Sequence, residues 1–263
     1  MKKKIVCVLV AAMMALSGSV VYAADAADSD LAYIKDKGTL IVGITDFAPM
    51  DYKDENGNWI GFDADLASKV AEDLGVKAEF VEIDWDNKIL ELNNKSIDCV
   101  WNGMTLTDEV LAAMNCSNPY ANNAQIVIVP AEKAADYQTV ESLAGLTFAV
   151  EAGSAGEAAA KELGNKYNPV QNQAATLLEV TAQTSDAAII DSLMAAAMVG
   201  EGTDYASLTY TVPLTEEKYG VGFRKDSDLA DALNDFFKTA WANGTLVEFA
   251  KLYGVQAAII PQE

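Results

Sequence analysis

The chain contains no histidine, and this absence removes several kinds of active site from consideration. A Ser-His-Asp triad, a Cys-His dyad, a histidine general base and the usual histidine-containing zinc sites are all excluded. Acid-base chemistry by Asp, Glu, Lys or Tyr stays possible. Neither a G-x-G-x-x-G motif after a strand nor a G-x-x-x-x-G-K-[ST] loop is present. Their absence argues against a nucleotide-binding protein.

The segment 153–156, Gly-Ser-Ala-Gly, could bind an anion because it opens a predicted helix directly after a predicted strand. Backbone N–H groups at the start of a helix can hold a negative charge. An ordinary loop of small residues with a serine cap is the more common alternative. The turn by itself leaves both interpretations open.

Of the three cysteines, Cys7 lies in a predicted export signal, so Cys99 and Cys116 remain in the mature chain. Two thiols in an oxidising compartment can form a disulfide. They can equally be small buried hydrophobic side chains. Spacing along the sequence does not decide between these alternatives.

The first 23 residues have the pattern of a signal peptide. Lys2 to Lys4 give a positive start, the stretch 5–21 is apolar, and small residues lead up to Ala23. The stretch is short for a membrane span of about 20 residues, which disfavours an uncleaved anchor. We therefore expect cleavage near Ala23 and a periplasmic or secreted protein.

The charge balance also limits the possible partners. The chain has 263 residues, 18 of them Lys or Arg and 39 Asp or Glu, for a net charge of −21. Nucleic acid requires a basic surface, so we expect no nucleic-acid partner. A chain of this length in which 51% of residues are hydrophobic can build two lobes of ordinary size.

Strand-like and helix-like segments alternate along the mature chain. Predicted strands cover 40–44, 78–83, 97–101, 125–129, 146–150, a segment near 170, 187–190, 208–212 and 220–223. Predicted helices cover 62–74, 87–92, 107–114, 154–163, 174–182, 191–199, 228–242 and 246–252. This alternation, without a hairpin signature, predicts α/β layers with mostly parallel sheets.

Ten segments, in order and spacing, resemble the bacterial solute-binding proteins for polar amino acids (family 3), which are the receptors of ABC importers. The longest is 97–107, IDCVWNGMTLT. The others are 38–43, 48–52, 61–67, 85–86, 117–120, 153–157, 186–191, 219–223 and 243–245. The resemblance covers nearly all of the mature chain.

The resemblance implies a two-lobed fold like that of the type II periplasmic binding proteins. Each lobe would be a mostly parallel sheet flanked by helices, and two hinge crossings would join the lobes. The implied boundaries are 24–119 and 220–263 for the first lobe, 125–214 for the second, and 120–124 and 215–219 for the crossings. The ligand would lie in the cleft between the lobes.

The family pattern also implies the ligand contacts. Phe47 and Trp85 match aromatic residues that sandwich the ligand. Asn102, Gly103 and Thr105 match the strand end that meets the ligand's amino group, and Asp191 matches the acid that pairs with it. Ser154 and Ala155 match the loop that holds the carboxylate, and Glu151 and Asp46 are two further acids near these segments. The alternatives are core packing for the aromatic residues, a helix N-cap for Asp191 and solvated acids for Glu151 and Asp46.

One departure from the family pattern bears on the ligand. The family carries an arginine, which pairs with the ligand's carboxylate, at the position occupied here by Val110. The chain's single arginine, Arg224, matches no ligand contact. An amino acid would then be held by backbone N–H groups at Thr105 and Ala155, with Lys88 as a possible substitute. Alternatively, the ligand is an amine or another cation that lacks the carboxylate.

The resemblance implies a receptor and not an enzyme, without metal or cofactor. Its partners would be an ABC permease and a separate ATPase, and the receptor itself would be a monomer. Two other functions stay open on the same fold. One is a periplasmic dehydratase-like enzyme with Glu151 as the acid-base group, and the other is a surface adhesin.

Overall fold

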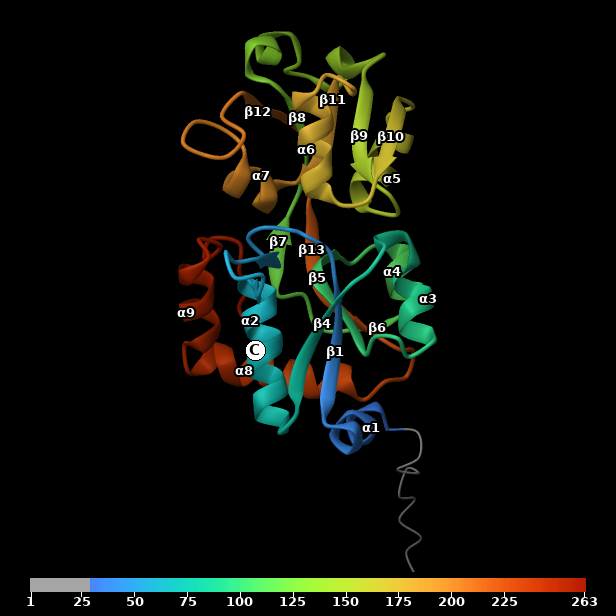
Figure 1. Ribbon diagram of the computed structural model, residues 1–263, viewed down its shortest axis with the longest axis vertical. Coiled ribbons are helices and arrows are strands. Elements are labelled where there is room, and N and C mark those ends of the chain that lie inside the picture. The colour runs from blue at the N-terminus through green and yellow to red at the C-terminus, as the bar shows by residue number, and fades with distance from the viewer. Residues whose placement is uncertain (1–28) are drawn as a thin grey trace, which may run out of the picture.

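The computed structural model describes residues 29–263, so the predicted signal peptide lies outside the described part. The chain forms two lobes, one above the other in Figure 1, and each is built on its own β-sheet. In the described range, no helix is both long enough and apolar enough to cross a membrane.

The first lobe contains a sheet with strand order β4-β1-β5-β13-β6, to which β7 adds by pairing with β13. Its strands are β1 (Thr39–Ile44), β4 (Lys77–Glu82), β5 (Cys99–Thr105), β6 (Asn115–Cys116), β7 (Ala121–Asn123) and β13 (Glu217–Phe223). Its helices are α1 (Asp30–Lys37), α2 (Phe62–Leu74), α3 (Lys88–Asn93), α4 (Asp108–Ala113), α8 (Leu229–Ala242) and α9 (Thr245–Leu252), with a 3-10 turn η1 (Trp85–Asn87) before α3.

The second lobe contains a sheet with strand order β10-β9-β11-β8-β12. Its strands are β8 (Gln125–Pro130), β9 (Thr147–Glu151), β10 (Lys166–Val170), β11 (Ala187–Asp191) and β12 (Leu208–Pro213). Its helices are α5 (Ala155–Glu162), α6 (Gln173–Thr181) and α7 (Ser192–Met198), with 3-10 turns η2 (Ala131–Asp136) and η3 (Val140–Leu143).

The two-lobed α/β fold is confirmed, but the sheets are mixed and not mostly parallel. Strands β1, β4 and β5 are parallel, as are β9, β10 and β11, and helices connect them as expected. Strands β13 and β8 run antiparallel to their neighbours. Both follow directly after the chain has passed from one lobe to the other, so no crossover helix sets their direction.

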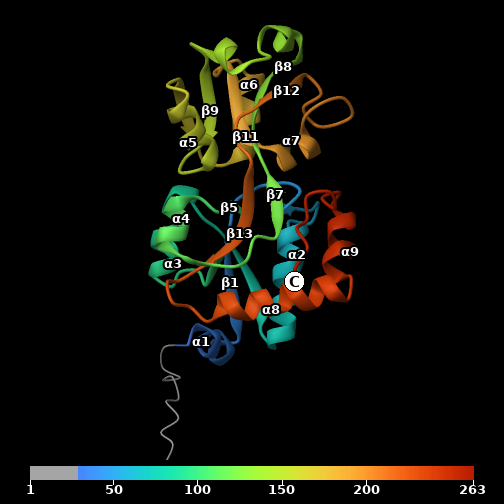
Figure 2. The ribbon, with the colours of Figure 1, turned by 180° about the vertical axis from the view of Figure 1, so that it is seen from behind.

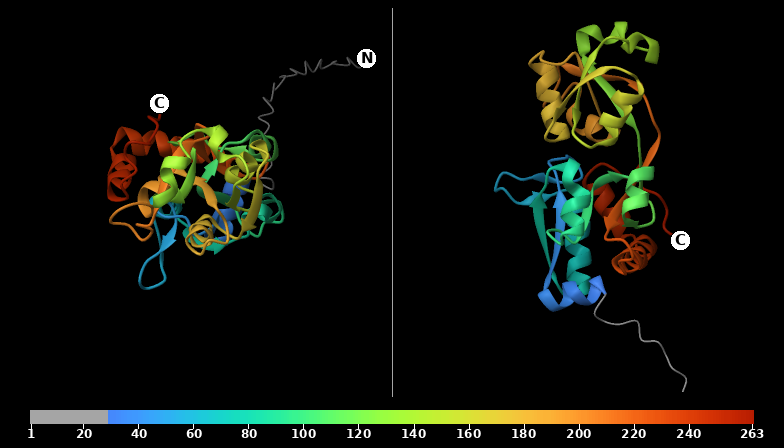
Figure 3. Two further views of the ribbon diagram at one scale, coloured as in Figure 1. Left: turned by 90° about the horizontal axis from the view of Figure 1, so that it is seen from above. Right: turned by 90° about the vertical axis from the view of Figure 1, so that its right-hand side faces the viewer.

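A hairpin that the sequence analysis did not expect projects from the first lobe (Figure 3). Its strands are β2 (Tyr52–Lys53) and β3 (Trp59–Ile60), which pair antiparallel. The turn contains Asn56 and Gly57, and Gly57 has a φ of 80°. Asn-Gly is a strong hairpin signal, so the signature was present in the sequence.

The chain passes between the lobes twice, from β7 to β8 and from β12 to β13, and Figure 2 shows the two segments side by side. The N–H of Leu214 donates to the carbonyl of Gln125 at 2.8 Å. The N–H of Gln125 donates to Oγ1 of Thr215 at 3.2 Å. The two connections are therefore tied together and lie along one side of the molecule (Figure 3, right).

The sheet register keeps the two cysteines apart. Cys99 on β5 pairs with Phe223 of β13, and Cys116 on β6 pairs with Gly222 of the same strand. Strand β13 thus lies between them, and two strand spacings amount to about 9.6 Å. That exceeds the Cα separation of about 7 Å beyond which a disulfide cannot form. Both cysteines are free thiols, so the disulfide alternative does not hold.

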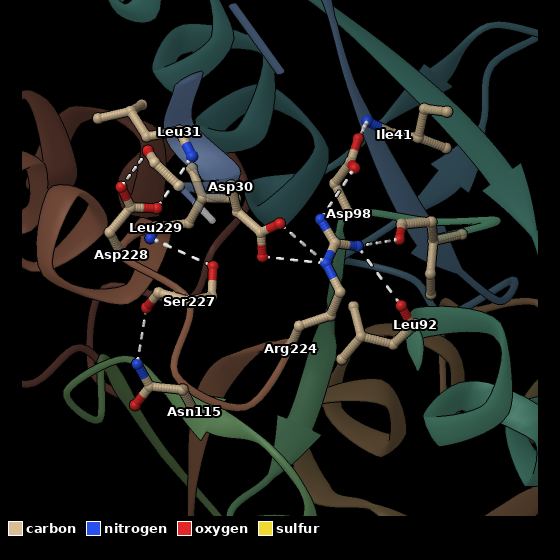
Figure 4. Close-up of polar contacts among 12 residues, drawn as sticks. Asp30, Leu31, Ile41, Leu92, Asp98, Asn115, Arg224, Ser227, Asp228 and Leu229 are labelled. Atoms are coloured by element: carbon tan, nitrogen blue, oxygen red, sulfur yellow. Dashed lines mark hydrogen bonds and ion pairs between the residues drawn. The ribbon is translucent and has the colours of Figure 1, made fainter. Parts of the chain in front are cut away.

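Arg224 is fixed in the first lobe by a buried charge cluster (Figure 4). Its guanidinium lies 2.9 Å from Asp30 and 3.3 Å from Asp98, and it donates to the carbonyl of Ile97 at 2.9 Å. Lys37 adds a second cation, 2.6 Å from Asp98. The chain's single arginine therefore has a structural role, which agrees with the expectation that it makes no ligand contact.

Candidate ligand-binding site

A cavity of about 290 Å³ opens between the two lobes, and residues from both line it. It brings together nearly all the side chains that the sequence analysis selected: Phe47, Trp85, Lys88, Asn102, Gly103, Thr105, Glu151, Ser154, Ala155 and Asp191. The remaining lining residues are Met104, Thr107, Asp108, Glu109, Val110, Gly153, Ala158 and Gln173. In the described part of the chain, no group of three or more Cys, Asp or Glu residues is placed to hold a metal ion.

Asp46 is the selected residue that does not line the cavity. Its carboxyl group is partly buried elsewhere, and this burial, together with nearby Glu82, raises its pKa. The neighbouring Phe47 turns inward and is only 2% exposed. Phe47 lines the cavity, whereas its neighbour Asp46, beyond the end of β1, does not.

The aromatic residue Phe47 is positioned by a glycine. Gly103 has a φ of +52°, and a Cβ atom there would lie 2.4 Å from the Phe47 ring. Only glycine therefore allows the strand end of β5 to pass so close to the ring. Phe47 also makes an edge-to-face contact with Tyr219, with ring centroids 6.3 Å apart.

The side-chain amide of Asn102 is hydrogen-bonded within the first lobe and is not free to contact a ligand. Its Oδ1 accepts from the N–H and the hydroxyl of Thr45, both at 2.9 Å. Its Nδ2 donates to the carbonyl of Thr45 at 3.1 Å and to Asp51 at 2.7 Å. The amide thus joins the end of β1 to the middle of β5, and only the backbone of Asn102 is available to a ligand.

Asp191 stands at the end of β11 and enters the cavity from the second lobe. It occupies the N-cap position of α7, as the alternative expected, but its side chain makes no capping hydrogen bond to that helix. It accepts hydrogen bonds from Tyr219 at 2.7 Å, from Gln125 at 3.1 Å and from Asn123 and Gln173. Burial, followed by repulsion from Glu217, raises the pKa of Asp191 well above its usual range.

Glu151 is the second buried acid of the cavity, at the end of β9, and it is only 2% exposed. Its Oε1 atom has no hydrogen-bond partner among the described residues. Burial raises the pKa of Glu151 to about 8, although Thr45 and then Lys88 act in the opposite direction. A buried, unpartnered carboxylate oxygen is costly unless a ligand donates to it.

Lys88 is the buried cation of the cavity and lies on α3 of the first lobe. Its ammonium group donates across the cleft to the carbonyl of Gly153 at 2.9 Å and to the carbonyl of Trp85 at 3.2 Å. The same nitrogen lies 5.0 Å from the centre of the Trp85 ring. An ammonium has three protons, so one of them stays available to a ligand.

The loop before α5 reaches across the cleft to the first lobe. Gly153 has a φ of +70°, and a Cβ atom there would lie 2.7 Å from the Cα atom of Asp86. Ser154 caps the helix by accepting from the N–H of Glu157 at 3.1 Å. No described residue accepts a hydrogen bond from the N–H groups of Ala155 and Gly156. These two donors can therefore serve an anion.

Val110 lies on the wall of the cavity, at the position where the family pattern has an arginine. It is 4% exposed and belongs to an apolar cluster that includes Trp85 and Met104. Thr107 caps its helix, α4, by accepting from the Val110 N–H at 3.2 Å. The site thus has an apolar surface where a guanidinium would otherwise stand.

Gln173 is the main contact that the sequence analysis missed. Its Oε1 accepts from the N–H of Asp191 at 2.9 Å, and its Nε2 donates to the Asp191 carboxylate. It begins α6 directly after the cap residue Asn172. Nothing in the polar stretch around it distinguishes it from a solvated glutamine, because its partner lies 18 residues away.

Comparisons with known proteins agree with this architecture. The family model "Bacterial extracellular solute-binding proteins, family 3" matches residues 40–256. Arginine-binding extracellular protein ArtP of Bacillus subtilis is 31% identical over 221 residues, covering 82% of this chain and 86% of the relative. A probable histidine-binding protein of Neisseria gonorrhoeae is 30% identical over 263 residues, covering 96% and 94%.

Solved structures give the same result. A mutant of the arginine-binding protein ArgBP from T. maritima has a TM-score of 0.80 at 32% identity, with 85% of this chain and 98% of that chain covered. The ancestral amino acid-binding protein AncCDT-1, described as a precursor of cyclohexadienyl dehydratase, has a TM-score of 0.78 at 33% identity, with 86% and 99% covered. The chain therefore belongs to family 3 of the bacterial extracellular solute-binding proteins.

Proposed function

We propose that this protein is an extracytoplasmic receptor that captures one small amino acid between its lobes and delivers it to an ABC importer. The observation that carries the proposal is the charge pattern of the cavity. Two buried acids, Asp191 and Glu151, stand in the same cavity as one buried cation, Lys88, and the unpaired N–H groups at the start of α5. A zwitterion presents complementary charges to both sets.

In this proposal the ligand's ammonium pairs with Asp191, beside the aromatic rings. Its carboxylate accepts from Lys88 and from the N–H of Ala155, which takes over the task of the absent arginine. Glu151 then receives a donor from the ligand's side chain. The cavity volume of about 290 Å³ lies at the lower end of the range for small-molecule sites, which suits a single amino acid.

A second ligand class is supported by one specific observation. Val110 offers no donor to a carboxylate, and Lys88 already donates to two carbonyl groups. An amine without a carboxylate would still satisfy Asp191 and Glu151. The relatives favour the amino acid, since those described above are named for arginine, histidine or amino acid binding.

We also propose the cellular setting that goes with this function. Residues 1–23 would direct export and be removed near Ala23, and the mature receptor would act as a monomer outside the cytoplasmic membrane. A permease and an ATPase encoded as separate chains would complete the importer. The segments 120–124 and 215–219 would act as the hinge between lobes 24–119 plus 220–263 and 125–214. We do not propose catalysis, because the similar proteins described above are named as binding proteins.

A thermal-shift panel on ligand-stripped protein tests the proposal. Each amino acid is paired with the amine that its decarboxylation would give, for example L-lysine with cadaverine. A ligand at 1,000 times its Kd adds about 4 kcal/mol to the free energy of unfolding, which is a large shift. Stabilisation by amino acids alone supports the proposal, whereas stabilisation by amines alone selects the second ligand class. No stabilisation by either set would contradict the receptor function.

The variant Val110→Arg sharpens the same test. If the cavity holds an α-carboxylate near α4, the new guanidinium can form a two-point contact with it and tighten amino acid binding. Leu111→Arg on the exposed face of α4 is the matched control. Equal Kd values for the two variants would place the carboxylate away from α4 and leave Lys88 as its cationic partner.

A further inference from the structure

Two carboxylates share hydrogen-bond donors where the chain passes between the lobes. The side-chain amide of Asn123 donates to Oδ1 of Asp191 and, at 2.6 Å, to Oε1 of Glu217. The amide of Gln125 donates to the same two oxygens, at 3.1 Å and 2.7 Å. One pair of amides therefore holds both acids in a single unit.

This unit connects the crossings with the cavity. Asp191 lines the cavity from the second lobe. Glu217 does not line it, but it accepts the hydroxyl proton of Thr105, a lining residue of the first lobe, at 2.9 Å. Glu217 therefore contacts the site through Thr105 on one side and through the amides that it shares with Asp191 on the other.

No positive charge neutralises the two acids within residues 29–263, because neither forms a salt bridge there. The charged or titratable groups around them are Tyr219, Lys218 and Glu216 on and beside β13, Tyr120 behind Tyr219, and Glu151 and Lys88 in the cavity. Tyr219 donates its hydroxyl proton to Asp191, and Lys218 is exposed. Burial, followed by repulsion from the nearby Glu217, raises the pKa of Asp191, so its carboxyl group resists ionisation.

We propose that Glu217 is a positioning residue of the ammonium site, and that it forms with Asp191 a two-carboxylate unit that exchanges one proton for the ligand's ammonium. This inference rests on the proposed function, since it takes an ammonium as the ligand group. The ligand keeps its own protons, and the unit releases its proton to the buffer. The charge of the site is therefore the same before and after binding.

The exchange makes affinity depend on pH. A proton that must leave for the ligand to bind opposes binding at low pH, so Kd falls as pH rises across the range in which the unit titrates. Transfer of one full proton corresponds to a tenfold change in Kd per pH unit. The variant Glu217→Gln keeps an oxygen for the three donors but removes the second acid.

The first experiment measures protons released on binding. Calorimetric titrations with L-arginine, or with the strongest ligand of the thermal-shift panel, are run at one pH in buffers of different ionisation enthalpy. Glu216→Gln is the matched control, because it removes the same charge from the adjacent, exposed residue. We expect Glu217→Gln to release fewer protons than the wild type and to show a flatter plot of log Kd against pH. We expect Glu216→Gln to match the wild type.

A second measurement needs no ligand. In the empty protein, the repulsion between the two acids grows as pH rises, so the wild-type Tm should fall from pH 5 to pH 8 by more than the Tm of Glu217→Gln. If no compound binds, the proposed function fails while this measurement still decides on the acid pair. Equal proton release, or equal Tm profiles, in the wild type and Glu217→Gln would overturn the inference.

Discussion

Two charge clusters in this protein, one buried and one with the partly exposed Glu217, follow opposite rules. Around Arg224, two acids meet a guanidinium and the ammonium of Lys37, so the opposite charges are matched within the fold. Around Asp191 and Glu217, two acids meet only amides and hydroxyl groups. Both clusters join segments that are far apart in the sequence. Only the second is built into the ligand cavity.

The difference lies in the cations: Lys37 and Arg224 pair with the acids of the first cluster, and no cation pairs with the acids of the second. A buried acid that lacks a cation raises the free energy of the folded state, and such exceptions are expected at functional sites. The matched cluster stabilises the first lobe whether or not a solute is present. The unmatched cluster becomes balanced when a positively charged group arrives from solution.

The largest effect should follow from breaking the matched cluster. Arg224→Met leaves Asp30 and Asp98 buried without the guanidinium, and we expect the free energy of unfolding to fall by about 3–5 kcal/mol. Urea denaturation measures the loss. Lys225→Met, at the exposed neighbouring residue, should change stability by less than about 0.5 kcal/mol. A similar result for both variants would show that the cluster does not stabilise the lobe.

Removing an acid from the unmatched cluster should affect ligand binding strongly and stability only weakly, the reverse of what we expect for Arg224→Met. Asp191→Asn should weaken binding of an amine-bearing ligand by about 2–5 kcal/mol, because the ammonium loses its charge partner. The free energy of unfolding should fall much less than for Arg224→Met, since Asp191 forms no salt bridge that the substitution could break. Calorimetry and urea denaturation test the two parts. Asp186→Asn, at the exposed start of the same segment, is the control, and an unchanged Kd for Asp191→Asn would refute the ammonium contact.

Lys88→Met tests whether the cavity's cation serves the ligand. We expect amino acid binding to weaken by about tenfold, through loss of one charge-assisted hydrogen bond. Binding of the matching amine should strengthen, because the cavity becomes more acidic. Competition titrations on the variant and on the exposed control Lys77→Met measure both changes. If the Kd values of the amino acid and of the matching amine changed in the same direction, Lys88 would act only by holding the lobes together.

The effect with the smallest slope is a pH dependence of the free energy of unfolding set by Glu151. Its pKa is raised to about 8 in the ligand-free protein, so the folded state holds a proton that the unfolded chain releases near pH 4. Stability should therefore fall as pH rises from about 5 to 8, by at most about 1.4 kcal/mol per pH unit. Urea denaturation of wild type and Glu151→Gln across this range should converge at low pH. Parallel curves would contradict the raised pKa.

Local sequence patterns predicted the parts of the molecule that depend on near neighbours. Strand-helix alternation predicted the layers of both lobes, and family-like segments selected the residues from Phe47 to Asp191 that line one cavity. The Asn56-Gly57 hairpin was also predictable and was overlooked. Phe47 lines the cavity and its neighbour Asp46 does not, so the ligand contact expected of Asp46 stays a prediction.

The hydrogen bonds around Asp191 and Glu217 could not be predicted in this way. Thr105 and Glu217 form one hydrogen bond across 112 residues, and Gln125 and Asp191 form another across 66. Each of these side chains stands in an ordinary polar context, so its partner is decided only when the strands of its own sheet pair, β5 with β13 in the first lobe and β8 with β11 in the second. The same is true of Asn102, whose amide is consumed by contacts with Thr45 and Asp51.

The contact between Gly153 and Asp86 sets a limit on how far the lobes can approach each other, whatever lies in the cavity. The backbone of Gly153 lies against the backbone of Asp86 at the edge of the cavity, here called the rim. A solute small enough to fit inside the cavity lets the two lobes keep this contact. A bulkier solute would hold the rim apart and stretch the bond from Lys88 to the Gly153 carbonyl. The close approach at this glycine thereby links the size of a solute to the separation of the lobes at the edge of the cavity.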